Sequence, residues 1–253
     1  MVPRGEIRVI PVPLAGEIRP GDDLVEKLTA ALRHQRLKLR TGDILVVKHK
    51  IVSKAEGQVK PLGSVKPSLG ARSWSRRSGI DARVIELALS VSKRIVRKKK
   101  GVLITETRHG FTCANSGVDV SNVDGGESAV LLPKNPDRSA ANLRTRLKRR
   151  FRCDIAVIIS DSFGRPWREG LTEVAIGIAG MKPLADYRGQ RDPHGYALHA
   201  SYEAVADEVA CAAGLVCGKL NRTPVCIVRG FAIQSGRGSA RELIRPAKND
   251  LFR

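Results

Sequence analysis

The stretch VIISDSFGRPWREG, residues 157–170, decides how the chain is interpreted. Its apolar, β-branched start predicts a buried strand, which we expect to end at Asp161 and Ser162. Gly164 and Arg165 come next, followed by a proline and more charge. An ordinary strand end and turn would explain this order. A metal and phosphate site would explain it as well, because carboxylate and hydroxyl oxygens are the ligands that Mg²⁺ and Mn²⁺ prefer.

Composition indicates a globular protein with a strong preference for anionic partners. The 253 residues are enough for one large domain or two small ones, and 42% of them are hydrophobic. Lys and Arg number 45 against 25 Asp and Glu, which gives a formal charge of +20. Such an excess attracts nucleic acid, anionic lipid or phosphorylated small molecules, and the charge alone leaves these classes open.

Cysteine usage and apolar runs indicate the compartment. The five cysteines are odd in number and show no C-x-x-C spacing, which predicts buried reduced thiols rather than a zinc site. The N-terminal stretch has no apolar core of signal-peptide length, and no run of about 18 apolar residues occurs. We therefore expect a soluble, cytoplasmic protein without a membrane partner.

Hydrophobic periodicity predicts strands and helices that are mixed without strict alternation. Strands are expected at residues 6–12, from residue 44 onward, at 102–107 and 111–114 as a hairpin, at 154–161 and at 223–231. Helices are expected within residues 21–37, 81–100, 137–151 and 201–218. Residues 173–180 fit a strand or a tight helix, residues 63–79 a flexible connection, and the basic tail 94–100 a solvated helix end. This mixture predicts an α+β fold.

Two further loops carry candidate chemistry. The loop NSGVDVSN places Asp119 three residues before Asn122, and VSKAEG places Lys54 just past an apolar run. Carboxylate and amide oxygens suit a divalent cation, and a lysine can neutralise a nucleotide phosphate. The alternative is that Asp and Asn only complete loop hydrogen bonds and that the lysine is solvated. The chain has neither a Walker loop nor a Rossmann glycine turn, so any nucleotide binds by another means.

An ordered set of segments resembles one family, the coenzyme F420-0:L-glutamate ligases. The segments are HKIVSKAEG, ANSGVDVSNV, LLPKNPD, SDSFGRPWREG, AIGIAGMKPLADYRG, DPHGY, EAVADEVA and VRGF. The resemblance covers about residues 9–253. It implies a single ligase-like unit over residues 1–253, with two subdomains as an open alternative, built from mixed, largely antiparallel sheets with packed helices. We expect no C-terminal flavin-reductase-like domain of the kind that some bacterial members carry.

The resemblance also implies the reaction and its partners. Family members attach L-glutamate to the lactyl carboxylate of F420-0, and commonly add a second one by a γ-linkage. They use GTP and Mn²⁺ or Mg²⁺ with help from K⁺, and they form homodimers. Transfer of the GTP γ-phosphoryl group would turn the carboxylate into an acyl phosphate that the glutamate amine attacks.

Site residues carry over by position. Asp119 and Asp161 match metal-binding aspartates, and Ser162 matches a Thr or Ser on a second metal. The positions expected at the nucleotide are Pro13, Leu14, Ala15, Gly16, His49, Lys50, Lys54, Asn122, Leu215, Val216, Cys217, Gly218 and Lys219. Arg165, close to Asp161 in the chain, is the candidate for holding an anionic substrate or the transferring phosphoryl group.

The chain departs from the archaeal-type pattern at three nucleotide positions. His49-Lys50 replaces a Ser-Thr pair, Gly218-Lys219-Leu220 replaces an acidic GEG, and the early loop reads PLAG. The preferred nucleotide and the number of glutamates therefore stay open. Two other functions stay open too: a ligase for another small carboxylate, and a basic RNA-binding protein that has lost the activity. Aromatic residues are only 4% of the chain and do not cluster among basic ones, which argues against nucleic acid as a partner.

Overall fold

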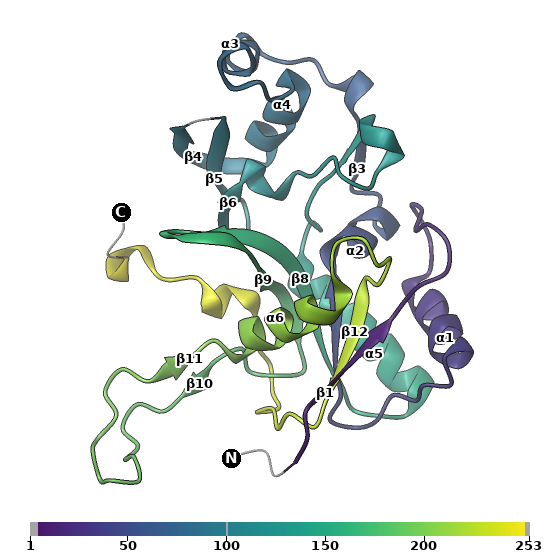
Figure 1. Ribbon diagram of the computed structural model, residues 1–253, viewed down its shortest axis with the longest axis vertical. Helices are drawn as coiled ribbons and strands as arrows, with labels where there is room; N and C mark the ends of the chain where they lie inside the picture. The colour runs from purple at the N-terminus through teal and green to yellow at the C-terminus, as the bar shows by residue number, and fades with distance from the viewer. Residues whose placement is uncertain (1–4, 100, 251–253) are drawn as a thin grey trace.

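The computed structural model describes residues 5–99 and 101–250 (Figure 1). The strands are β1 (Arg8–Val12), β2 (Ile44–Lys48), β3 (Val59–Pro61), β4 (Ser92–Lys99), β5 (Val102–Thr107), β6 (Thr112–Ala114), β7 (Ser128–Val130), β8 (Ala156–Arg165), β9 (Arg168–Ala179), β10 (Ala185–Asp186), β11 (Tyr202–Glu203) and β12 (Val225–Arg229). The α-helices are α1 (Leu24–His34), α2 (His49–Ala55), α3 (Leu69–Ser78), α4 (Ala82–Val91), α5 (Pro136–Phe151) and α6 (Val205–Cys217). The predicted α+β class is confirmed.

A five-stranded sheet in the order β1-β12-β2-β8-β9 forms the centre of the molecule. Only the β2–β8 pair is parallel, so this sheet is mixed and largely antiparallel, as predicted. Side chains alternate across a strand. Leu45 and Val47 therefore join the core beneath α1 and α5, whereas Ile44 and Val46 join the core beneath α6. Burial on both faces explains why β2 reads as a continuous apolar run.

A second lobe lies above this sheet in Figure 1 and has a hydrophobic cluster of its own. It contains α3, α4, the β4-β5-β6 sheet and the short β3–β7 pair. Ile85 of α4 and Leu103 of β5 are fully buried in this cluster. The prediction of one family unit with two subdomains as an alternative stays a prediction. Among the described residues, no helix combines the length and the apolar character needed to cross a bilayer.

Two predictions in this lobe are wrong. Residues 63–79 are not a loose connection, because Ser68 caps α3 by accepting a hydrogen bond from the amide of Ala71. Gly79, with φ 75°, ends that helix, and Ala71 is completely buried. The basic stretch after Val91 is the strand β4 rather than a helix end, because the helical apolar stripe stops there and the backbone pairs with β5. Lys100 of the predicted tail lies outside the described residues.

Two boundaries in the central sheet also differ from the prediction. The strand that begins at Ile44 ends at Lys48, and the β-branched residues that follow form helix α2. Strand β8 does not end at Asp161 and Ser162 but continues to Arg165, because β9 pairs with it along this length. The β8 register shifts between Ile159 and Ser160, and the strand changes from buried to partly exposed one residue later, at Asp161. Asp161 and Ser162 are therefore held by a ladder rather than by a turn.

The remaining predicted elements are confirmed. The hairpin β5–β6, helices α1 and α5, and strand β12 lie where the periodicity placed them. Helix α6 begins at Val205, after the short strand β11. Of the two alternatives for residues 173–180, the strand is correct, because residues 173–179 belong to β9. Asp23 caps α1, and Gly218 follows the last residue of α6. The five cysteines are free thiols, of which four are buried and Cys211 is partly buried.

Candidate functional site

The site is organised by three consecutive residues, Lys48, His49 and Lys50, at the junction of β2 and α2. Lys48 is the last residue of the strand and the N-cap of the helix, where its backbone is still extended. Because the chain changes here from a strand period to a helical one, the three side chains leave it in different directions. Each of them reaches an acidic residue from a different segment. We call this tripeptide the cationic junction.

Lys48 forms an ion pair with Glu173 of β9, with 2.5 Å between Nζ and Oε1. Glu173 is buried and also accepts hydrogen bonds from the hydroxyls of Ser160 at 2.9 Å and Ser162 at 2.6 Å. Burial alone would raise the pKa of Glu173, but Lys48 and the serine hydroxyls outweigh it, so the pKa lies below its ordinary value. Glu173 is therefore ionised and holds Ser162 in place.

His49 faces Asp161 of β8, with 3.3 Å between Nε2 and Oδ1. The ring is buried, and its Nδ1 lies 3.4 Å from the hydroxyl of Ser53 one turn along α2. Asp161 Oδ1 also accepts a hydrogen bond from the amide of Ser162 at 2.7 Å. The thiol of Cys113 lies near this carboxylate: its burial and the charge of Asp161 raise the pKa of Cys113 to about 12. That thiol is therefore protonated and is not a nucleophile.

Lys50 forms an ion pair with Asp119 at 2.7 Å and donates to the Ser121 hydroxyl at 2.7 Å. Asp119 also accepts from the amide of Ser121 at 2.7 Å. Its partial burial would raise the pKa, but Lys50 and Ser121 lower it below the ordinary value. One turn along α2, Lys54 donates to the carbonyl of Asn122 at 3.0 Å. The loop that carries Asp119 and Asn122 is thus tied to α2 at two points.

The predicted nucleotide stretch, Leu215 to Lys219, is a loop only in part, because its first three residues are the last three of α6. One residue of the stretch meets the site. Lys219 donates to the hydroxyl of Ser162 at 2.8 Å. Cys217 is buried, and its thiol lies 3.6 Å from that of Cys226, so its side chain faces the core rather than the site. Leu215 is 87% exposed, and Val216 packs on the core cluster beneath α6. Gly218, with φ 58°, turns the chain so that Lys219 can reach β8.

The predicted early loop, Pro13 to Gly16, lies next to Lys54. Leu14 packs on the core beneath α1, and the carbonyl of Pro13 accepts from the side chain of Gln35. Ala15 and Gly16 are exposed. The following residue, Glu17, accepts a hydrogen bond from Lys54 at 3.2 Å, which connects the loop to α2.

Arg165 is separated from these contacts. One terminal nitrogen donates to the carbonyl of Glu169 at 2.7 Å, within the turn that joins β8 and β9. Its buried Nε has no hydrogen-bond partner among the described residues. The structure therefore gathers the other charged residues predicted for the site around the cationic junction, whereas Arg165 contacts its own hairpin. Its catalytic role stays a prediction.

The oxygen donors fit a divalent cation that arrives with a polyphosphate. Among the described residues, no three His, Cys, Asp or Glu side chains form a group that could hold a metal alone. Mg²⁺ is usually bound by one or two carboxylates together with water and substrate phosphate oxygens, and it does not need such a group. Asp119, Asp161 and the Ser162 hydroxyl supply that kind of donor set. In this structure Lys50 forms an ion pair with Asp119, and the imidazole of His49 lies against Asp161.

The sequence did not identify Lys48, Ser160 or Glu173 as site residues. Lys48 could have been noticed, because a charged residue directly after a buried apolar run must have a partner or reach solvent. Glu173 gave no comparable signal, since an acid at the start of an apolar stretch is an ordinary strand feature. Its pairing with Lys48 depends on the order of strands in the sheet, which brings β9 and β2 to either side of β8.

Comparisons with known proteins identify relatives of the whole chain. The family model of F420-0:gamma-glutamyl ligase matches residues 14–230. The coenzyme F420:L-glutamate ligase of Methanopyrus kandleri is 43% identical over 252 residues, which cover 98% of each chain. The coenzyme F420:L-glutamate ligase of Methanothermobacter thermautotrophicus is 42% identical, over 96% of each chain. That of Methanocaldococcus jannaschii is also 42% identical, over 85% of this chain and 86% of the relative.

These relatives are ligases, and this chain is an enzyme of the same class. It belongs to the F420-0:gamma-glutamyl ligase family. The resemblance inferred from the ordered motifs is thereby confirmed.

Proposed function

We propose that the enzyme adds L-glutamate to F420-0, with GTP and a divalent cation, in the biosynthesis of coenzyme F420. The names of its relatives support the substrate, and the cationic junction supports the chemistry. The γ-phosphoryl group of GTP moves to an oxygen of the F420-0 carboxylate, which forms an acyl phosphate and releases GDP. The glutamate amine then attacks the carbonyl carbon, inorganic phosphate leaves, and the amine nitrogen loses a proton.

The observation that carries this proposal is the row of cations opposite oxygen donors. Lys48, Lys50, Lys54 and Lys219 all direct an ammonium group to the region of Asp119, Glu173 and Ser162. Phosphoryl transfer requires mainly positioning and positive charge on the phosphoryl oxygens, and a set of ammonium groups supplies both. A bound Mn²⁺ or Mg²⁺ would add charge at the same oxygens, and Asp119, Asp161 and Ser162 would hold it.

Glu173 and His49 have positioning roles in this proposal. Glu173 orients the hydroxyl of Ser162 through its 2.6 Å hydrogen bond. His49 lies against Asp161 and holds that carboxylate at a defined point on β8. Both residues are buried, so their geometry does not depend on mobile surface chains.

Further properties of the enzyme follow from the family and stay proposals. K⁺ acts as an additional cation, more than one glutamate can be added, and the active form is a homodimer. The exposed apolar residues Ile95 and Val96 on the edge strand β4 are compatible with such an interface. We place the enzyme in the cytoplasm, where GTP is available. Another small carboxylate is the second candidate acceptor, because a fold and a metal site do not determine the acceptor.

A mass-spectrometric assay tests the proposal. Purified enzyme is incubated with F420-0, L-glutamate, Mn²⁺ and either GTP or ATP. We expect a product heavier by one or more glutamyl units, formed only when nucleotide and metal are both present. Asp161→Asn should lower turnover by about 100-fold or more, because it removes a charge at the reacting phosphates. Circular dichroism of this variant is measured alongside, so that the lost turnover is assigned to the charge and not to unfolding.

Asp154→Asn is the matched control. It makes the same chemical change on an exposed residue near the other end of β8, so turnover should be retained. Near-normal activity of Asp161→Asn would contradict the proposed site. No product from folded enzyme, beside an active relative under the same conditions, would contradict F420-0 as the acceptor and favour another carboxylate.

A further inference from the structure

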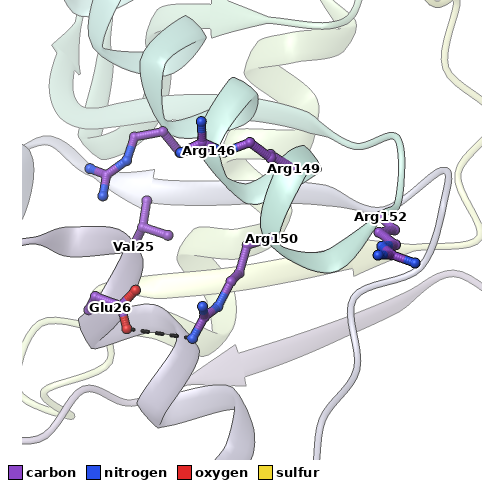
Figure 2. Close-up of a pocket in the computed structure, with 6 residues that line it drawn as sticks. All are labelled: Val25, Glu26, Arg146, Arg149, Arg150 and Arg152. Carbon is purple, nitrogen blue, oxygen red and sulfur yellow. Dashed lines mark ion pairs between the residues drawn. The ribbon is translucent and has the colours of Figure 1, made fainter.

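Cationic side chains from the C-terminal ends of α1 and α5 line two adjoining pockets away from the site described above, the first of which also contains Val25 and Glu26 from the first turn of α1. Figure 2 shows Arg146, Arg149, Arg150 and Arg152 around a pocket whose only acid among the lining residues is Glu26. An adjoining pocket shares Arg150. Together the two pockets are lined by seven cations: Arg33, Arg36, Lys38, Arg146, Arg149, Arg150 and Arg152. We call these seven residues the arginine surface.

Intramolecular ion pairs neutralise only part of this surface. Arg146 is paired with Asp23, and Arg150 lies 3.8 Å from Glu26, the contact drawn in Figure 2. Arg149 and Arg152 are exposed and have no hydrogen bond or ion pair with any described residue. Two guanidinium groups beside one pocket are thus available for an external anion.

The backbone favours cations at this place. Helix carbonyls point out of the C-terminal end of a helix, so positive charge is stabilised there. The chain leaves α1 through Arg36 at φ 55° and α5 through Arg152 at φ 53°. Glycine or asparagine is the usual residue in this left-handed conformation. Both helices instead have an arginine there.

The substrates of the ligase reaction do not explain the arginine surface. Arg152 precedes β8 by a few residues, and Asp161 lies five residues into that strand. At about 3.3 Å per residue, the start of β8 and Asp161 are about 16 Å apart. A nucleotide bound beside Asp161 would therefore lie near the middle of β8, about 16 Å from the end of the strand that is nearest to Arg152 in the chain. The arginine surface needs a different ligand.

The chemistry of the surface favours the phosphate backbone of duplex nucleic acid. Guanidinium groups bind phosphate through two parallel hydrogen bonds, and seven cations across two helix ends match a row of phosphates better than one small anion. No large hydrophobic residue of α1 or α5 in the described chain is exposed, so the surface lacks groups that would insert into a membrane. It also lacks an exposed aromatic platform for single-stranded bases. We propose that the arginine surface binds duplex RNA or DNA through its phosphates, independently of the ligase activity.

Fluorescence anisotropy tests this proposal with a blunt RNA duplex and a DNA duplex of the same sequence. We expect binding that weakens as salt increases. The double variant Arg149→Gln/Arg152→Gln removes two phosphate contacts. Its salt slope should be shallower by about 1.8, and its affinity about 30-fold lower near 0.15 M salt. The ratio of the RNA affinity to the DNA affinity then shows which of the two duplexes the arginine surface prefers.

Lys60→Gln/Lys66→Gln is the matched control, because it removes the same charge from exposed residues of the other lobe, outside the β4 edge proposed as a dimer interface. Binding that survives in this control and falls in the first double variant would support the arginine surface. Equal losses in both variants would assign the attraction to net charge and overturn the proposal. Absence of duplex binding, a preference for single strands, or binding only to phosphatidylserine vesicles would overturn it as well.

Discussion

Replacing Glu173 by glutamine tests the buried contact between β2 and β9. The substitution keeps the size of the side chain and removes its charge. Ser160 and Ser162 donate to different oxygens of Glu173, so only one of them can still donate to the single amide oxygen, and the other faces the amide NH2 group. Lys48 loses its only ion-pair partner among the described residues. The side chain of Lys48 is 20% exposed, so water can solvate the remaining charge only in part.

The expected loss follows from this geometry. Removing one partner of a buried ion pair costs about 3–5 kcal/mol of unfolding free energy, because the other charge stays buried. The partial exposure of Lys48 places the cost near the lower end, at about 3 kcal/mol. For a protein of this size, 1 kcal/mol corresponds to about 2–4 °C, so the melting temperature should fall by about 6–12 °C.

Thermal unfolding followed by circular dichroism provides the measurement, in a cycle of Glu173→Gln, Lys48→Met and the double variant. The double variant should be less destabilised than the sum of the single ones by about 2 kcal/mol, because the two residues are in contact. Glu169→Gln, an exposed residue of the same strand, is the control and should stay within about 0.5 kcal/mol of the wild type. Additive effects, or a Glu173→Gln variant as stable as this control, would refute the reasoning.

Two further predictions concern packing and pH. A Cβ atom at Gly177 would lie 2.5 Å from the backbone of Pro136, so Gly177→Ala should lower the melting temperature by several degrees. Gly63→Ala is the control: a Cβ atom there would have no atom within 4 Å, so the melting temperature should stay nearly unchanged. The pKa values of Glu173 and Asp119 lie below their ordinary values of 4.5 and 3.8, so the unfolded chain takes up protons first as the pH falls. Their contribution to stability is complete above those ordinary values and is lost in acid. A stability profile that falls equally steeply in Glu173→Gln would contradict this assignment.

Local patterns predicted the elements whose stability is decided locally. The apolar stripe of α1 is visible in the sequence, as are two candidate caps, Asp22 and Asp23, of which the structure uses Asp23. Strand β4 could not be predicted in this way, because its basic residues form a strand only by pairing with β5. The extension of β8 past Asp161 has the same cause, since it requires β9 as a partner.

The site shows the same division between local and distant causes. The motifs identified Asp119, Asp161 and Ser162 individually, and the structure ties all three to residues near the start of α2 or to Lys219. Nothing in the chain indicated that Lys48 and Glu173 would meet. Their contact arises from the order of the strands, which is a property of the whole sheet.

The cationic junction has a consequence for how members of this family can diverge. Its three side chains contact three acids. Their directions depend on β2 passing directly into α2, because Lys48 ends the strand and His49 begins the helix. One inserted residue would rotate the following helical positions by about 100° and turn Lys50 and Lys54 away from the loop that holds Asp119. Point substitutions and length changes can accumulate in the β10–β11 arm, which extends away from the body in Figure 1. The strand-to-helix junction, in contrast, can change its side chains but not its length.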